Sequence, residues 1–176
     1  MGEMTLSKEH EYSQDKQLTF CVLTTSDTRN VANDRGGWTI RQKLESAGHK
    51  IFETWICQDD KLEIESILEE WLRNPNIHGI ITTGGTGLGF RDVTPETIEP
   101  YFTKKIAGFG ELFRMISYTE DVGTKALLSR AEAGIIKDKV VYMLPGSVKA
   151  VELAMDKLVI PELHHIVHEI TKHLEG

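Results

Sequence analysis

The sequence has little cysteine, no long apolar run and no excess of basic residues. Its 176 residues include two cysteines, Cys21 and Cys57, which lie in apolar stretches and belong to no Cys-x-x-Cys pair. We therefore expect two buried, reduced thiols and no structural zinc site. No apolar run approaches the ~18 residues of a membrane-spanning helix, and the N-terminal residues are too polar for a signal peptide. These absences predict a cytoplasmic protein without a membrane partner.

The charge balance disfavours another class of partner. Acidic residues outnumber basic ones and give a net charge of −7, whereas a nucleic-acid backbone is bound by a basic surface. We expect no nucleic-acid partner, although a few local donors can still bind a small anion. The length, with 40% hydrophobic and 27% charged residues, is typical of one soluble globular domain.

Hydrophobic patterning divides the chain into a tail and one domain. Residues 1–17 are polar and lack a period, which predicts a mobile N-terminal tail, and residues 18–176 form the domain. Strands are expected at residues 18–25, 50–57 and 77–83. The helices between them are marked by two apolar faces, Ile40, Leu44 and Ala47, then Ile64, Ile67, Leu68, Trp71 and Leu72. This order predicts an α/β fold with three layers, α/β/α, and a mostly parallel sheet.

The second half of the chain is less regular. A helix is expected to begin near Thr94, with the Thr94 hydroxyl as its N-cap. Another should follow Gly108-Phe109-Gly110 and carry Leu112, Phe113 and Ile116, and residues 140–144 predict a buried strand. A further helical pattern is expected to break at Pro161, which then opens the last helix.

The most informative segment is the stretch IITTGGTGLGFRDVTPE, residues 80–96. An apolar strand leads into a loop that offers backbone N–H groups and hydroxyls, and its small residues leave room for an anion; these are Thr83, Gly84, Gly85, Thr86 and Gly87. Arg91 and Asp92 bring opposite charges to the rim, as a site for a metal-bound phosphate ester would need. A tight βα turn without a ligand is the alternative.

Two common nucleotide motifs do not fit this loop. A Walker A loop closes on Gly-Lys-Ser/Thr, whereas Gly89 is followed here by Phe90 and Arg91. The dinucleotide fingerprint, counted from Gly85 and Gly87, needs a glycine at Phe90. A phosphate bound by this loop is therefore bound by neither of these two motifs.

Four loops are expected at the carboxyl ends of parallel strands, where open α/β sheets bind their ligands. They are residues 26–29, residues 58–61, the glycine loop and residues 145–147. Their candidate binding residues, besides those of the glycine loop, include Ser26, Asp27, the pair Asp59-Asp60, Pro145, Gly146 and Ser147.

Other roles remain open for several of these side chains. Asp59 or Asp60 can cap the helix that follows, and Asp92 can simply pair with Arg91. Ser26 and its neighbour Asp27 can form a turn without any ligand.

Taken together, the motifs resemble those of the MoaB/MogA family of molybdenum cofactor biosynthesis proteins. The resemblance rests on TTGGTG at residues 82–87 and RDVTPE at residues 91–96. It extends to Ser26-Asp27, Asp59-Asp60, Gly108-Phe109-Gly110-Glu111, Leu128-Ser129-Arg130 and Leu144-Pro145-Gly146-Ser147, which occur in the family's order. The short Leu88-Gly89-Phe90 loop looks more like the MoaB branch than the MogA branch.

The resemblance implies a molybdopterin-binding α/β domain that assembles as a homo-trimer or homo-hexamer. It implies an adenylyltransferase that uses Mg-ATP to place AMP on the terminal phosphate of molybdopterin. Asp59 and Asp92 would be the catalytic acids and the Mg²⁺ ligands, and the glycine loop would hold the nucleotide phosphates. Ser26, Ser129 and Arg130 would lie on the pterin-phosphate side. Other enzymes of cofactor biosynthesis are implied as further partners.

The resemblance also carries a second hypothesis. Members of the MoaB branch need not all transfer AMP, so the chain can instead be a non-catalytic molybdopterin-binding or scaffold protein of the same pathway. Acidic residues at positions 59 and 92 favour catalysis.

Overall fold

The structure is a computed structural model, and it describes residues 14–175. Most of the expected N-terminal tail, residues 1–13, lies outside the described residues, so its mobility stays a prediction. Within the described part, no helix is both long and apolar enough to span a bilayer.

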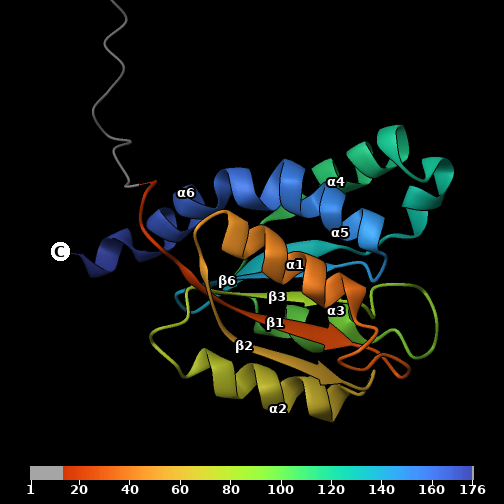
Figure 1. The fold of residues 1–176 in the computed structure, drawn as a ribbon, viewed down its shortest axis with the longest axis horizontal. Coiled ribbons are helices and arrows are strands. Elements are labelled where there is room, and N and C mark those ends of the chain that lie inside the picture. The colour runs from red at the N-terminus through yellow and green to blue at the C-terminus, as the bar shows by residue number, and fades with distance from the viewer. Residues whose placement is uncertain (1–13, 176) are drawn as a thin grey trace, which may run out of the picture.

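A six-stranded sheet in the order β2-β1-β3-β6-β5-β4 forms the middle layer (Figure 1). Its parallel strands are β1 (Thr19–Thr25), β2 (Lys50–Cys57), β3 (Gly79–Thr83) and β6 (Lys139–Leu144). Strand β5 (Glu132–Ile136) pairs antiparallel with β6, and β4 (Lys104–Lys105) pairs antiparallel with β5. The expected mostly parallel sheet is confirmed.

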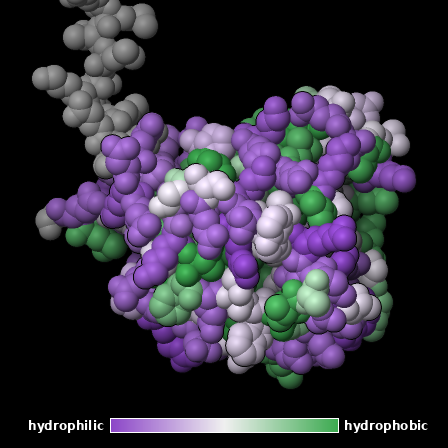
Figure 2. All heavy atoms as spheres, viewed as in Figure 1, coloured by the Kyte–Doolittle hydropathy of each residue, from purple (hydrophilic) through white to green (hydrophobic). Residues whose placement is uncertain are grey.

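Helices cover both faces of this sheet, which confirms the three layers (Figure 1). One face is covered by α1 (Arg35–Ser46), α4 (Ala107–Glu120), α5 (Val148–Ala154) and α6 (Ile160–Thr171). The other carries α2 (Lys61–Leu72) and α3 (Thr94–Ile98). Short 3₁₀ segments at Glu99–Tyr101, Gly123–Leu128 and Lys172–Leu174 complete the fold. On the face seen in Figure 2, hydrophilic residues predominate and apolar ones are scattered among them.

Two apolar clusters, one on each face of the sheet, form the core. The larger cluster lies under α1, α4, α5 and α6, and the smaller lies under α2 and α3. Cys21 and Cys57 belong to the smaller cluster and are free thiols, as predicted. Burial raises the pKa of each thiol to about 12, so neither is a reactive thiolate at neutral pH.

Several expectations for the second half of the chain are wrong. Pro161 does not break the helical run, because Met155–Val159 form a π-helical turn that joins α5 to α6 and accommodates a residue without an N–H group. Pro161 does lie in the first turn of the last helix, α6, as expected. Of the apolar residues expected on the helix after Gly110, Phe113 is buried, but Leu112 is 55% exposed. The helix, α4, begins earlier, at Ala107, and its buried face includes Phe109 as well as Phe113. Strands β4 and β5 were not anticipated; β4 has two residues, and β5 carries Gly134 in close contact with the Phe102 ring.

Two histidines hold the N-terminal end of β1, at the end of the sheet opposite the glycine loop. His49 Nδ1 accepts the N–H of Leu18 at 3.2 Å, and His78 Nδ1 accepts the N–H of Thr19 at 3.0 Å. An imidazole nitrogen that accepts a hydrogen bond must be unprotonated. Both contacts therefore require neutral rings.

The environment of both rings favours the neutral form. Burial lowers the pKa of His49, and the nearby His164 and His78 lower it further. Burial also lowers the pKa of His78, together with the positive charges of Lys16 and Lys139, against the opposing charge of Asp138.

This arrangement predicts a loss of stability in mild acid. Because the folded pKa values are depressed, the unfolded chain binds more protons, and stability falls as the pH drops below the ordinary histidine value of about 6.5. Loss of two hydrogen bonds at about 1 kcal/mol each should lower Tm by about 4–8 °C. Thermal unfolding measured between about pH 7.5 and about pH 5 checks this. The variant His78→Asn keeps an acceptor for Thr19 N–H and should show a shallower pH dependence; an unchanged profile would contradict the assignment.

Candidate functional site

The candidate site lies at the carboxyl ends of the parallel strands. From β1 the chain passes to β2 on one side, and from β2 it crosses back to β3 on the other side of β1. The strand order therefore switches between β1 and β3, which is where open α/β sheets bind ligands. The four loops expected from the sequence all emerge at this edge, after β1, β2, β3 and β6.

The glycine loop after β3 is held in an unusual backbone conformation. Gly84 and Gly85 have φ of 99° and 68°, a region that side-chain-bearing residues rarely adopt. A Cβ at Gly84 would collide with the carbonyl oxygen of Thr25, and a Cβ at Gly85 would collide with the Thr94 hydroxyl. Only glycine lets the loop approach β1 and α3 this closely.

Thr94 does not cap α3, contrary to expectation. The N-cap of α3 is Val93, which has no side-chain cap, and Thr94 is the first helical residue. Its hydroxyl instead lies 3.1 Å from both the carbonyl oxygen of Gly84 and Thr25 Oγ1, while its N–H donates to the carbonyl of Gly85. Thr94 therefore holds the glycine loop against β1 and α3 through these hydrogen bonds.

Arg130 holds the same loop from another direction. Its guanidinium donates to the carbonyl oxygens of Gly87 at 2.6 and 3.0 Å, Thr86 at 3.3 Å and Asp92 at 3.1 Å. It also pairs with Glu96 on α3. All of these contacts are within the protein, so the geometry gives Arg130 a structural role in the loop rather than a free charge for a ligand.

Arg91 pairs with Asp27 and not with its neighbour Asp92. Arg91 Nε and Nη2 donate to Asp27 Oδ2 and Oδ1 at 3.0 and 2.9 Å, a two-point contact between the loops after β3 and β1. The hydrogen bonds from Arg91 hold the pKa of Asp27 below its usual value. Asp92 accepts the N–H of Gly89 at 2.8 Å within its own loop.

Asp59 and Asp27 are joined by two reciprocal hydrogen bonds between backbone N–H groups and carboxylate oxygens. The N–H of Asp27 donates to Asp59 Oδ2 and that of Asp59 to Asp27 Oδ1, each at 3.1 Å. Burial raises the pKa of Asp59, and the negative charge of Asp27 raises it further, with a smaller contribution from Asp92. Its neighbour Asp60 caps α2 by accepting the N–H of Glu63, so the two acidic residues have different roles.

Asp59 and Asp92 have the donor chemistry that Mg²⁺ requires. Asp59 Oδ1 is buried and has no hydrogen-bond partner among the described residues. No group of three or more His, Cys, Asp or Glu side chains in residues 14–175 can hold a metal by itself. This fits Mg²⁺, which is commonly bound by one or two carboxylates together with substrate phosphates.

Two cavities, each of about 400 Å³, flank the glycine loop. We call the first the serine cavity; it is lined by Thr24, Thr25, Ser26, Thr28, Arg29, Asp34, Gly36, Thr83, Gly84, Gly146 and Ser147. The second, the glycine-loop cavity, lies toward α4, and its lining includes Gly85, Thr86, Gly87, Asp92, Phe113, Lys125, Ser129 and Pro145. Gly84, Gly146 and Ser147 line both, so the cavities meet there.

The predicted site residues are therefore divided between two places. Ser26 lies in the serine cavity, whereas Ser129 lies in the glycine-loop cavity, on the other side of Gly84. Asp27, Asp59, Arg91 and Arg130 line neither cavity. Asp27, Arg91 and Arg130 connect the loops to one another, whereas Asp59 also carries the buried oxygen that has no partner among the described residues.

Three serine hydroxyls are oriented by backbone N–H groups. Ser26 Oγ accepts from Thr28 and Arg29, Ser147 Oγ accepts from Ala150, and Ser129 Oγ accepts from Ala131. A hydroxyl that accepts in this way retains its own proton to donate. The turn at Ser26 and the N-cap at Ser147 are thus compatible with donation to an anion.

Two cations at the cavities were not among the predicted binding residues. Arg29 lines the serine cavity, and within residues 14–175 its guanidinium donates only to the carbonyl oxygen of Asn33. Lys125 lines the glycine-loop cavity and makes no ion pair within the described residues. Arg29 lies in a loop that the sequence had indicated; Lys125 reaches the site only because the 3₁₀ segment at Gly123–Leu128 packs on α4.

Fold and site together define a doubly wound α/β domain with its candidate site at the strand switch point. Residues 21–165 match the family described as "Probable molybdopterin binding domain". The chain therefore belongs to the family of molybdopterin-binding domains of molybdenum cofactor biosynthesis, and within it to the MoaB branch.

Similar sequences from two bacteria support this placement. The chain is 50% identical over 160 residues to molybdenum cofactor biosynthesis protein B of Staphylococcus aureus strain Mu50, covering 90% of this chain and 95% of that one. It is 44% identical over 162 residues to the protein of the same name from Bacillus cereus, covering 92% and 96%.

Solved structures agree with the sequence relatives. A crystal structure of molybdenum cofactor biosynthesis protein B has a TM-score of 0.87 at 44% identity, covering 90% of this chain and 98% of that one. The tungsten cofactor synthesizing protein MoaB from Pyrococcus furiosus has a TM-score of 0.79 at 37% identity, covering 88% and 98%.

The contacts of Arg130 predict that it holds the glycine loop in place. The variant Arg130→Gln loses the guanidinium N–H donors, and each hydrogen bond from a charged donor is worth about 1.5–3 kcal/mol. We expect amide hydrogen exchange in residues 84–92 to rise at least tenfold, and Tm to fall by about 4–8 °C. Arg73→Gln at the end of α2 is the control. Unchanged exchange in the loop would show that Thr94 and the glycine geometry suffice.

Proposed function

We propose that this protein binds molybdopterin and transfers AMP from Mg-ATP to the terminal phosphate of molybdopterin, with release of pyrophosphate. A phosphate oxygen of the pterin attacks the α-phosphorus of ATP, a new P–O bond forms, and the bond to the β-phosphate breaks. The observation that supports this most is the pair of cavities that meet at Gly84, Gly146 and Ser147. Transfer between two phosphates requires both substrates to bind with those phosphates in contact, and two cavities that meet provide for this.

The linings favour one assignment of the substrates. The serine cavity, with Ser26, Thr28 and Arg29, offers hydroxyls and a cation for the terminal phosphate of the pterin. The glycine-loop cavity offers backbone N–H groups and Lys125 for the nucleotide phosphates, and Phe113 adds apolar surface. On this assignment Ser129 is on the nucleotide side.

The chemistry depends mainly on charge. Bringing a phosphate monoester against ATP places several negative charges together, so the site must supply donors and cations where the new bond forms. Ser26 and Ser147 have oriented hydroxyls, and Arg29 and Lys125 are cations without a carboxylate partner among the described residues. No covalent nucleophile is required, because the phosphate attacks directly.

Magnesium fits this proposal through Asp59 and Asp92. When bound, Mg²⁺ would neutralise phosphate charge at the transferred group. Asp92 would present its carboxylate from the wall of the glycine-loop cavity, fixed by the Gly89 N–H. Asp59 would contribute the buried oxygen that lacks a partner among the described residues.

Cytoplasmic location and a homo-trimer or homo-hexamer remain part of the proposal. Exposed apolar side chains on α4, on the 3₁₀ segment that follows it and between the two provide surface that an assembly would bury; they are Leu112, Met115, Tyr118, Val122, Leu127 and Leu128.

Asp92→Asn tests the catalytic proposal. Asparagine still accepts the Gly89 N–H, so the loop should keep its shape, but the negative charge toward magnesium is lost. We expect pyrophosphate release to fall at least about 100-fold, with molybdopterin affinity within about twofold. Asp138→Asn, in the turn between β5 and β6, is the control. Wild-type turnover in Asp92→Asn would refute the role, and wild-type protein that binds molybdopterin but never releases pyrophosphate would support the scaffold hypothesis.

Asp59→Asn should separate stability from activity. The raised pKa of Asp59 means that its charged form is disfavoured in the folded protein. The charge therefore lowers the free energy of unfolding at pH values above the folded pKa, and this destabilisation disappears as the pH falls through that pKa. A neutral amide can keep the hydrogen bond from Asp27 N–H. At neutral pH we expect Tm to be unchanged or to rise by up to about 4 °C while turnover is lost. A clear fall in Tm would show that the Asp59 charge stabilises the fold.

A further inference from the structure

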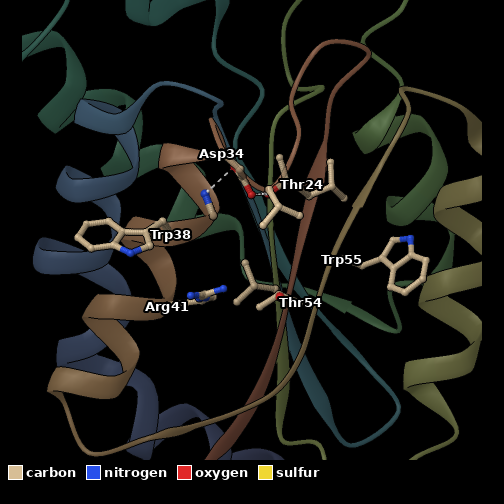
Figure 3. Close-up of a pocket in the computed structure, with 10 residues that line it drawn as sticks. Thr24, Asp34, Trp38, Arg41, Thr54 and Trp55 are labelled. Atoms are coloured by element: carbon tan, nitrogen blue, oxygen red, sulfur yellow. Dashed lines mark hydrogen bonds between the residues drawn. The ribbon is translucent and has the colours of Figure 1, made fainter.

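Helices that cover the sheet hold the segments that form the site. Asp34, the N-cap of α1, accepts from Thr24 Oγ1 at 2.7 Å and from the N–H of Gly37 at 3.0 Å, which joins α1 to the end of β1 (Figure 3). A second junction joins α4 to residues 129–131, the segment that carries Arg130 and leads into β5. Because Arg130 binds the carbonyls of the glycine loop, the contacts that fix this segment also bear on that loop.

Arg114 on α4 makes the contact that reaches this segment. Its Nη1 donates to the carbonyl oxygen of Ala131 at 3.0 Å, and Ala131 directly follows Arg130. Ala131 is buried, and a buried carbonyl needs a hydrogen-bond donor from the protein. Because consecutive Cα atoms are about 3.8 Å apart, a shift at Ala131 also moves Arg130.

Glu132, the first residue of β5, lies beside this arginine. Its side chain is 9% exposed, and its Oε2 lies 3.2 Å from Lys105 Nζ and 4.0 Å from Arg114 Nη2. Its Oε1 is buried and has no hydrogen-bond partner among the described residues. A buried carboxylate with an unsatisfied oxygen lowers the stability of a fold. We therefore look for the role of Glu132 in what it positions.

Gly110 leaves room for this arrangement. A Cβ at Gly110 would lie 2.7 Å from Glu132 Oε1 and 2.8 Å from both the Ala131 carbonyl oxygen and Arg114 Nη2. Gly110 lies inside α4, where glycine is less favourable than alanine. Gly108 lies two residues earlier in the same helix, and a Cβ there would meet nothing within 4 Å. Packing therefore requires glycine at position 110 and not at position 108.

We infer that Arg114 and Glu132 are positioning residues for adenylyl transfer. Arg114 fixes the Ala131 peptide, Glu132 fixes Arg114, and Gly110 lets both side chains lie against the backbone of α4. Their effect reaches the glycine loop through Arg130, because none of the three lines the serine cavity or the glycine-loop cavity. The reaction itself rests on the proposed function, whereas the effect on the loop does not.

Two variants test this inference from different sides. Arg114→Met removes the donor, and Gly110→Ala displaces the Ala131 carbonyl. In each variant, amide hydrogen exchange in residues 84–92 should rise roughly fivefold or more. The kcat for pyrophosphate release should fall about tenfold, because a displacement of about 1 Å at a catalytic site costs up to about 100-fold. The KM for molybdopterin should stay within about twofold, because Arg130 does not line the serine cavity.

Matched variants provide the controls. Gly108→Ala adds the same methyl group to the same helix without a new contact, so loop exchange and kcat should match wild type. Arg114→Lys keeps a donor for the Ala131 carbonyl and should recover part of both losses. Glu132→Gln removes the charge beside Arg114 and should reproduce the losses in part. Tm shows that each variant is folded.

Three outcomes decide the matter. Wild-type loop exchange and kcat in folded Arg114→Met and Gly110→Ala would overturn the inference. A rise in exchange that extends equally to α2 would also overturn it, because that pattern indicates a general loss of stability. Wild-type protein that binds molybdopterin without releasing pyrophosphate would refute the adenylyl transfer, and exchange in residues 84–92 would still decide whether Arg114 positions the loop.

Discussion

The hydrogen bonds from Arg130 to the glycine loop are the contact on which the rest of the site depends. In a trans peptide the C=O and N–H groups point in opposite directions. Because the carbonyls of Thr86 and Gly87 turn toward Arg130, the N–H groups of the same peptides turn away from it. One guanidinium thus sets the direction of several donors. It can do so because Gly84 and Gly85 allow a backbone course that side chains would block.

A second constraint is the distribution of charge around this loop. The chain is acidic overall, Asp92 lines the glycine-loop cavity, and Asp27 and Asp59 lie in the loops after β1 and β2. Arg91 neutralises Asp27 and ties the first and third loops together, whereas Asp59 keeps a buried oxygen without a partner in the described part of the chain. Such an oxygen reduces the stability of the unliganded fold and favours a bound cation. This is the compromise between stability and function expected at an active site.

The serine cavity and the glycine-loop cavity extend this picture along the carboxyl edge of the sheet. The first is lined by the ends of β1 and β3 and by the loop after β6, and the second by the loops after β3 and β6 together with α4. They share Gly84, Gly146 and Ser147. The MoaB relatives and the molybdopterin-binding family place the protein in molybdenum cofactor biosynthesis; the assignment of each compartment is what the proposed experiments decide.

The sequence by itself determined the alternation of strands and helices, the glycine loop and the order of the four loops, because these follow from local periodicity and backbone preference. It could not show that Arg130 binds loop carbonyls, that Arg91 pairs with Asp27, or that Ser26 and Ser129 lie in different cavities. Nor could it show the π turn at Met155–Val159, just before Pro161, or the place of Lys125. These depend on how distant elements pack, which local patterns do not encode, and only the tertiary structure decided them.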